Sequence, residues 1–148
     1  MKKIEEIITA DFKDEHHKAL INIRYTSNFI GAYYNQQLEV FDLTLAQFNI
    51  LRILRGAKEL LSIKTVKERM VEKSPNTTRL VDKLISKGFV ERFRCNVDRR
   101  IIHISITELG LYTLSNLDIH LDHRIFSKNM TDEEVETMNY LLNKFRNE

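Results

Sequence analysis

The sequence predicts a mainly α-helical fold that contains a single β-hairpin. Four glycines and one proline in 148 residues favour long helices over a loop-rich β fold. Apolar residues recur at helical spacing through residues 74–87, and after Gly88 the period changes to strict alternation through residues 102–106. A short helix followed at once by a hairpin predicts a winged helix-turn-helix, with a two-stranded wing and long helices at both ends of the chain.

Residues 11–41 are expected to form one long amphipathic helix, preceded by a short apolar turn at residues 4–8. Gly31 inside this helix costs roughly 1 kcal/mol relative to alanine, and the helix should end near Asp42. The apolar positions follow spacings near three, four and seven: Leu20, Ile23, Ile30, Tyr33, Tyr34, Leu38 and Phe41.

Two shorter helices follow. Thr44 and Gln47 have the spacing of a capping box and open a helix that should end near Gly56. Its apolar residues are too dense for one exposed face, so we expect it to be buried on both sides. Ser62 can cap the next helix, and the three-residue link 71–73 then leads to the helix at 74–87, which makes a helix-turn-helix.

The helix at 74–87 carries its own start and stop signals. Ser74 is a suitable N-cap, Pro75 fits the first helical position, and Gly88 is a natural C-terminal stop. The core side is expected to hold Thr77, Leu80, Val81, Leu84 and Ile85, and the opposite side Asn76, Arg79, Asp82, Lys83 and Ser86.

The hairpin and the C-terminal helices complete the chain. Strands are expected at 89–94 and 102–106, joined by a polar tip at 95–100 whose Asn and Asp favour a turn. Thr107 should cap a helix that runs to about Phe126 and carries two apolar stripes, which need two packing partners. A second capping box at 131–134 opens the last helix.

Charge is distributed unevenly along the chain. Residues 58–100 hold 12 Lys and Arg against 6 Asp and Glu, whereas the remainder holds 11 against 15. A basic middle localises a polyanionic partner there, unless the charges only solvate helix faces. There is no apolar run near 18 residues, no apolar stretch for a signal peptide and only one cysteine, so we expect a cytoplasmic protein without membrane contact or an internal disulfide.

In its central part the chain resembles the MarR family of bacterial transcription regulators. The resemblance runs from about Leu43 to Leu114 and is carried by four pieces in order: LTLAQFNIL, TTRLVDKLISKGFVER, DRR and ITELG. It implies one protomer of 1–148, in which 43–107 form a winged helix DNA-binding lobe and 1–41 with 108–148 form a helical dimerisation lobe. It also implies a homodimer on the two halves of a pseudo-palindromic operator in double-stranded DNA.

The same resemblance implies roles for individual residues. The helix at 74–87 would enter the major groove, where Arg79 can pair with a guanine edge. Arg100 would be the minor-groove residue and Asp98 the carboxylate that orients it, whereas Arg92 is either structural or DNA-facing. The DNA-binding residues implied in this way are Ser74, Asn76, Thr78, Arg79, Lys83, Arg94, Asp98, Arg99 and Arg100.

An acid on the same helix stands against this role. Asp82 faces outward with the candidate DNA contacts and would repel phosphate unless Arg79 or another base pairs with it. Sequence alone leaves the partner open.

Several aromatic, histidine and cysteine side chains could have either a chemical or a structural role. Four aromatic residues are candidates to line an effector cavity of the kind that the family has, although core packing competes with that role: Phe29, Tyr33, Tyr34 and Phe48. Weak metal candidates are His16, His17, His120 and His123, without a second cluster of ligands at clear spacing. Cys95 near the wing tip is either an inert thiol or a redox-sensitive one.

The function expected from this sequence is an effector-responsive repressor. No pattern supports enzyme chemistry, and no cofactor is expected. A thiol-based enzyme would require Cys95 to turn over a substrate without an evident histidine partner. The main alternative is a winged helix used for protein–protein contact without specific DNA binding. The pair of Asp98 and Arg100 at an exposed tip distinguishes the two, because a minor-groove finger needs that pair and a protein-docking wing does not.

Overall fold

The computed structural model describes residues 2–72, 76–94 and 102–146. Its helices and strands follow the order that the sequence predicts, with one short extra strand. They are α1 (Ile4–Ile7), α2 (Glu15–Glu39), α3 (Leu45–Ala57), β1 (Leu61–Ser62), α4 (Ile63–Arg69), α5 (Thr77–Ser86), β2 (Val90–Arg94), β3 (Ile102–Ile106), α6 (Glu108–His120), a 3₁₀ helix (His123–Phe126) and α7 (Asp132–Arg146).

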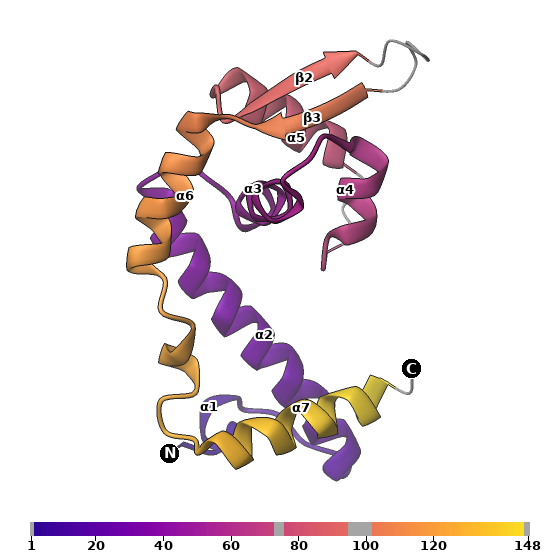
Figure 1. The fold of residues 1–148 in the computed structure, drawn as a ribbon. Coiled ribbons are helices and arrows are strands. Elements are labelled where there is room, and N and C mark those ends of the chain that lie inside the picture. Colours follow the sequence, from indigo (N-terminus) through magenta and orange to yellow (C-terminus); the bar gives the residue numbers. More distant parts are fainter. Residues whose placement is uncertain (1, 73–75, 95–101, 147–148) are drawn as a thin grey trace.

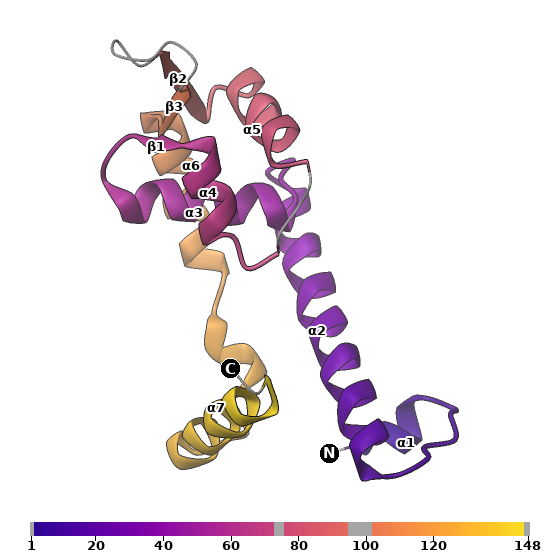
Figure 2. The same ribbon diagram turned by 90° about the vertical axis from the view of Figure 1, so that its right-hand side faces the viewer.

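The molecule has a winged helix lobe at one end and a helical extension at the other (Figure 1). The lobe contains α3 to α6 and the sheet, and α2 runs from it to the far end, where α1 and α7 lie (Figures 1 and 2). This arrangement confirms the predicted winged helix between long terminal helices. Among the described helices, none is at once long enough and apolar enough to cross a membrane.

The sheet is antiparallel and has three strands in the order β1-β3-β2. The wing pair runs from Val90 opposite Ile106 to Arg94 opposite Ile102. The predicted two-stranded wing is confirmed, and the sheet gains a third strand that was not predicted, because Leu61 in β1 pairs with Ile104 in β3. A strand of two residues is too short to show an alternating pattern in the sequence.

Helix α3 is the centre of the core, as predicted. Its residues Phe48, Ile50, Leu51 and Leu54 are all buried. The capping box is also confirmed, because the Thr44 N–H donates to Gln47 Oε1 at 3.1 Å and the Gln47 N–H donates to Thr44 Oγ1 at 3.3 Å.

Helix α5 begins later than its sequence signals suggest. Its N-cap is Asn76 and its first residue is the buried Thr77, whereas the expected cap Ser74 and first helical residue Pro75 lie outside the described residues. The predicted stop is confirmed: Gly88 has φ 74°, and the N–H groups of Gly88 and Phe89 close a Schellman motif on the carbonyls of Ile85 and Leu84.

The fifth predicted helix is shorter than expected. Helix α6 ends at His120, and a 3₁₀ helix follows, so continuous helix to Phe126 is wrong. The Asp122 carboxylate accepts from the Arg124 N–H at 2.8 Å and so caps a new turn instead of extending the old one. As a result, His120 and His123 do not share one helix face.

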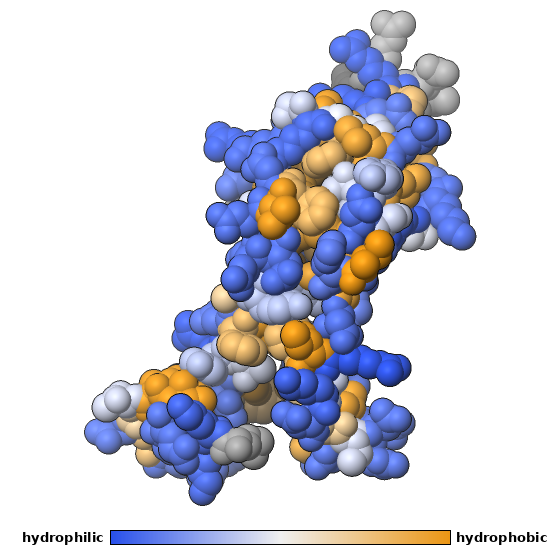
Figure 3. Space-filling view, turned by 90° about the vertical axis from the view of Figure 1, so that its left-hand side faces the viewer, coloured by the Kyte–Doolittle hydropathy of each residue, from blue (hydrophilic) through white to orange (hydrophobic). Residues whose placement is uncertain are grey.

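Helix α7 opens with the predicted capping box. The Thr131 N–H donates to Glu134 Oε2 at 2.9 Å, and the Glu134 N–H donates to Thr131 Oγ1 at 3.3 Å. Within Asp132–Arg146 no residue is buried. On the side of the molecule that Figure 3 shows, hydrophobic patches lie among hydrophilic side chains. Exposed apolar residues of α6 and α7 include Leu109, Tyr112, Ile119, Met138, Tyr140, Leu141 and Phe145.

Candidate nucleic-acid interface

The helix-turn-helix is formed by α4 and α5. Ser62 caps α4, because its hydroxyl accepts from the Thr65 N–H at 3.0 Å. Helix α5 packs on the core through Thr77, Val81 and Leu84, all of them buried. The amphipathic pattern predicted for this helix is thus confirmed, and its opposite side faces solvent.

The solvent side of α5 brings together four of the residues implied to bind DNA. Asn76, Thr78, Arg79 and Lys83 are exposed there. Arg94 is exposed at the end of β2, opposite Ile102 of β3. The other implied residues, Ser74, Asp98, Arg99 and Arg100, lie outside the described residues, as does Cys95.

The acid on this surface has a partner. Arg92 on β2 donates from Nη2 to Oδ1 of Asp82 on α5. Of the two possible roles of Arg92, structural or DNA-facing, the structure shows the structural one. Arg92 is the basic side chain that pairs with the outward-facing Asp82. The pair joins the wing to α5 and compensates the negative charge of Asp82 beside the cationic side chains of this face.

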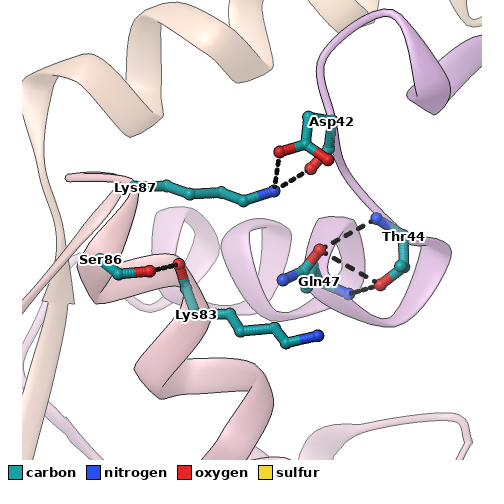
Figure 4. Close-up of polar contacts among 6 residues, drawn as sticks. All are labelled: Asp42, Thr44, Gln47, Lys83, Ser86 and Lys87. Carbon is teal, nitrogen blue, oxygen red and sulfur yellow. Dashed lines mark hydrogen bonds and ion pairs between the residues drawn. The ribbon is translucent and has the colours of Figure 1, made fainter.

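A second ion pair holds the other end of α5. Lys87 Nζ lies 2.7 Å from Oδ2 of Asp42 and also donates to the Asp42 carbonyl oxygen (Figure 4). Asp42 adopts the left-handed conformation with φ 51°, which turns the chain between α2 and α3. The hydrogen bond and charge of Lys87, and then the charge of Lys83, hold the pKa of Asp42 below its ordinary value.

The remaining cations leave a positive surface. Among the described residues, Arg79, Lys83 and Arg94 take part in none of the ion pairs. Sequence reasoning missed three further exposed cations on α4, Lys64, Lys67 and Arg69. These three cations are part of the positive charge excess in residues 58–100. Helical spacing alone did not show which of the basic residues in that range lie on the same surface.

The candidate effector residues separate into two groups. Tyr34 and Phe48 line a cavity of about 550 Å³ between α2, α3 and α7. Phe29 and Tyr33 do not line it; their rings pack on Phe126 with centroid distances of 6.1 and 5.1 Å. Of the four aromatic residues, two are therefore placed to contact a ligand in this cavity.

The histidines have separate surroundings. Nδ1 of His123 lies 2.9 Å from the Tyr34 hydroxyl, and Nδ1 of His17 accepts from the Lys13 N–H. His16 and His120 are exposed. Within the ranges that the structure describes, no three His, Cys, Asp or Glu side chains form a group that could hold a metal ion.

The fold and this surface define a winged helix-turn-helix protein with a basic helix face. The MarR family model matches residues 43–102. The multiple antibiotic resistance protein MarR of Escherichia coli is 33% identical over 116 residues, which cover 74% of this chain and 78% of MarR. The transcriptional regulator SarZ of Staphylococcus aureus is 31% identical over 115 residues, which cover 77% and 74%. The chain belongs to the MarR family, as its resemblance predicted.

Solved structures agree with this assignment. A mutant of Escherichia coli MarR complexed with operator DNA has a TM-score of 0.80 to this chain at 28% identity. The match covers 92% of this chain and 99% of the MarR chain. The Staphylococcus aureus MepR–DNA complex has a TM-score of 0.77 at 22% identity and covers 86% of this chain and 94% of MepR. The second likeness shows the shared fold.

Proposed function

We propose that this chain is a homodimeric transcription regulator that binds double-stranded DNA sequence-specifically and represses until an effector binds. The observation that carries the proposal is the outward face of α5, where Arg79 and Lys83 are exposed and the neighbouring Asp82 is paired with Arg92. Relatives of the same family support it, since an Escherichia coli MarR mutant forms a complex with operator DNA.

In the proposed complex, α5 enters the major groove. The guanidinium of Arg79 can donate two hydrogen bonds to one guanine, and Asn76 can contact adenine or phosphate. Lys83, Arg94 and Arg99 would meet phosphates, which position the protein without reading sequence. Arg100, oriented by Asp98, would enter a narrow A·T-rich minor groove, where the negative potential is enhanced.

A second copy of the chain would cover the exposed apolar faces. Leu141 is 55% exposed on α7 and Ile119 is 79% exposed on α6, and no residue of α7 is buried in the protomer. Contiguous exposed apolar patches on a protein surface mark protein–protein contacts. An obligate interface of this kind buries more than about 2,000 Å². Two lobes held in this way would present two α5 helices to half-sites about 10 bp apart.

The cavity beside Tyr34 and Phe48 supports effector binding. It borders α2 and α7 of the proposed dimerisation lobe as well as α3 and Val71 of the winged helix lobe. A ligand there would contact both lobes, and its differential affinity for their two arrangements would shift DNA binding.

In vitro selection of DNA sites tests the proposal directly. We expect a pseudo-palindrome, with log affinity falling against log salt by about 0.9 per phosphate contact. A winged helix used only for protein contact would return no symmetric motif, and its residual DNA binding would show no sequence preference. Either result would overturn the proposal.

A further inference from the structure

A second pocket, of about 760 Å³, lies against the C-terminal end of α5. It is separate from the aromatic cavity and is lined mainly by polar side chains from α2, the α2–α3 turn, α3 and α5. Figure 4 shows Gln47 of α3, Lys83 of α5 and Lys87, which directly follows α5, in this region. The side chains that matter for its chemistry are Asn35, Glu39, Asp42, Gln47, Lys83 and Lys87.

Gln47 is the unusual member of this set. It is 2% exposed, and its Oε1 accepts from both the N–H and the hydroxyl of Thr44 in the capping box. That role fixes the orientation of the amide, so Nε2 points away from Thr44 (Figure 4). Nε2 of Gln47 has no hydrogen-bond partner among the described residues. Every described side-chain nitrogen or oxygen that is fully closed off from solvent does have a partner, so Nε2 is not fully closed off. The Nε2 donor therefore opens into the pocket.

The two lysines differ in what they leave for a ligand. Lys87 is engaged by the carboxylate and carbonyl of Asp42. Lys83 forms no ion pair within the described part of the chain. The pocket thus offers one ammonium group and one buried amide N–H₂ that need acceptors, above the buried side chain of Leu43.

We infer that this pocket binds a small polar anion that carries a carboxylate or phosphate group. Its oxygens accept from Nε2 of Gln47, which has no acceptor among the described residues, and from Nζ of Lys83, which forms no ion pair there. The protein alone leaves the Nε2 donor to solvent, and an oxyanion in the pocket gives it a negatively charged acceptor, which forms a stronger hydrogen bond than a neutral one. The polar lining selects a hydrophilic ligand over an aromatic one.

The site has a regulatory consequence that rests on the proposed DNA-binding function. Lys83 is proposed to contact a DNA phosphate from α5, and an anion in the pocket competes for the same ammonium group. It also adds negative charge beside the helix that faces DNA. Occupancy of this pocket therefore weakens DNA binding.

Anion binding is tested on the full chain without DNA, by calorimetry at constant ionic strength with malonate and inorganic phosphate as separate probes. In Gln47→Glu the capping box is retained, because Glu and Gln serve equally at that position, but the N–H₂ donor is replaced by a carboxylate. We expect its anion affinity to fall at least about tenfold, the worth of one hydrogen bond to a charged group. Circular dichroism checks that the variant folds.

Two charge variants make the test specific to the pocket. Glu39→Gln removes an acid from its lining and should tighten anion binding, whereas Glu136→Gln removes an exposed acid from α7 and should leave it unchanged. Saturation by malonate alone identifies a carboxylate site, and saturation by phosphate alone a phosphate site. Saturation by neither probe, or equal binding by wild type and Gln47→Glu, overturns the inference.

The regulatory step is read on DNA recovered by selection. The effective anion should lower the DNA affinity of the wild type and not that of Gln47→Glu. An equal response of the two proteins overturns the regulation while DNA binding stands. Absence of DNA binding by either protein overturns the proposed function instead, and the anion titrations still decide the site.

Discussion

The carboxylate of Asp82 on α5 accepts a hydrogen bond from the guanidinium of Arg92 on β2, so the proposed recognition helix and the wing are joined by a charge pair. Both side chains are more than one third exposed, at 53% and 38%, and water screens their attraction. Such pairs contribute about 0.2–1 kcal/mol to stability. The pair matters more for the sign of the surface potential than for folding.

The first prediction concerns this pair. Arg92→Ala should weaken DNA binding, because it leaves the Asp82 carboxylate uncompensated beside the phosphates. Asp82→Ala combined with Arg92→Ala should recover part of the loss. A double-mutant cycle by urea unfolding should give a coupling of about 0.2–1 kcal/mol. Wild-type DNA affinity in Arg92→Ala would contradict the assigned role.

Arg79 provides the second prediction. Its exposed position on α5 is suited to bidentate recognition of guanine, and Arg79→Ala should cost about 1–3 kcal/mol and relax preference at one position of each half-site. Arg79→Lys is the matched control, since it keeps the charge but not the planar pair of donors. Repeating the site selection with both variants measures the effect. An unchanged motif would exclude Arg79 from base contact.

The wing provides the third prediction. Arg100→Ala should weaken binding and reduce the salt slope by about one per wing, because one positive charge per wing no longer displaces counterions from the DNA. Arg100→Ala should weaken only the preference for A·T over G·C base pairs outside the half-sites. Asp98→Ala should give a milder form of the same loss, since the guanidinium remains without its orienting carboxylate. Salt titrations on DNA with A·T or G·C flanks separate these effects, and full-strength binding by Arg100→Ala would show that the hairpin does not read DNA.

The fourth prediction addresses the homodimer. Leu141 is 55% exposed on the apolar face of α7. Leu141→Asp places a charge in the proposed interface and should shift the protein toward monomer. Asn143→Asp adds the same charge at an exposed position beside Arg146 and should leave assembly unchanged. Sedimentation at low micromolar concentration decides, and a wild type that sediments only as a 17.5 kDa species would refute the dimer.

Much of the fold was predictable because its signals are local. The capping boxes at Thr44 and Thr131, the Gly88 stop and the amphipathic face of α5 all depend on residues within four positions of one another. An error arose where two local signals compete. The capping preference of Asp122 ended α6 earlier than its apolar stripes implied.

The candidate site was predictable in its residue types but not in its pairings. The exposed positions of Arg79 and Lys83 follow from helical spacing. The partner of Asp82 is ten residues away on a different element, and the partner of Lys87 is 45 residues away. Among the described residues, the N–H₂ group of Gln47 is free because the capping box uses the amide oxygen, Oε1. Only the three-dimensional structure shows which of the two amide atoms faces Thr44.

The last prediction contrasts two glycines. A Cβ on Gly110 would lie 2.4 Å from the carbonyl oxygen of Phe89 and 2.7 Å from Cγ1 of Ile106. The Phe89 oxygen cannot easily retreat, because it accepts from the Thr107 N–H at 3.0 Å at the start of α6. Gly110→Ala should therefore destabilise the protein by about 1–3 kcal/mol, the usual cost of overpacking.

Gly31 is the matched control for that substitution. It lies within α2, and no atom is within 4 Å of an added Cβ. Because glycine in a helix interior is disfavoured relative to alanine, Gly31→Ala should stabilise the protein by roughly 0.5–1 kcal/mol. Urea unfolding of both variants measures the two shifts at one protein concentration. Effects of the same sign would show that the close approach of α6 to Phe89 does not limit the packing of the winged helix lobe.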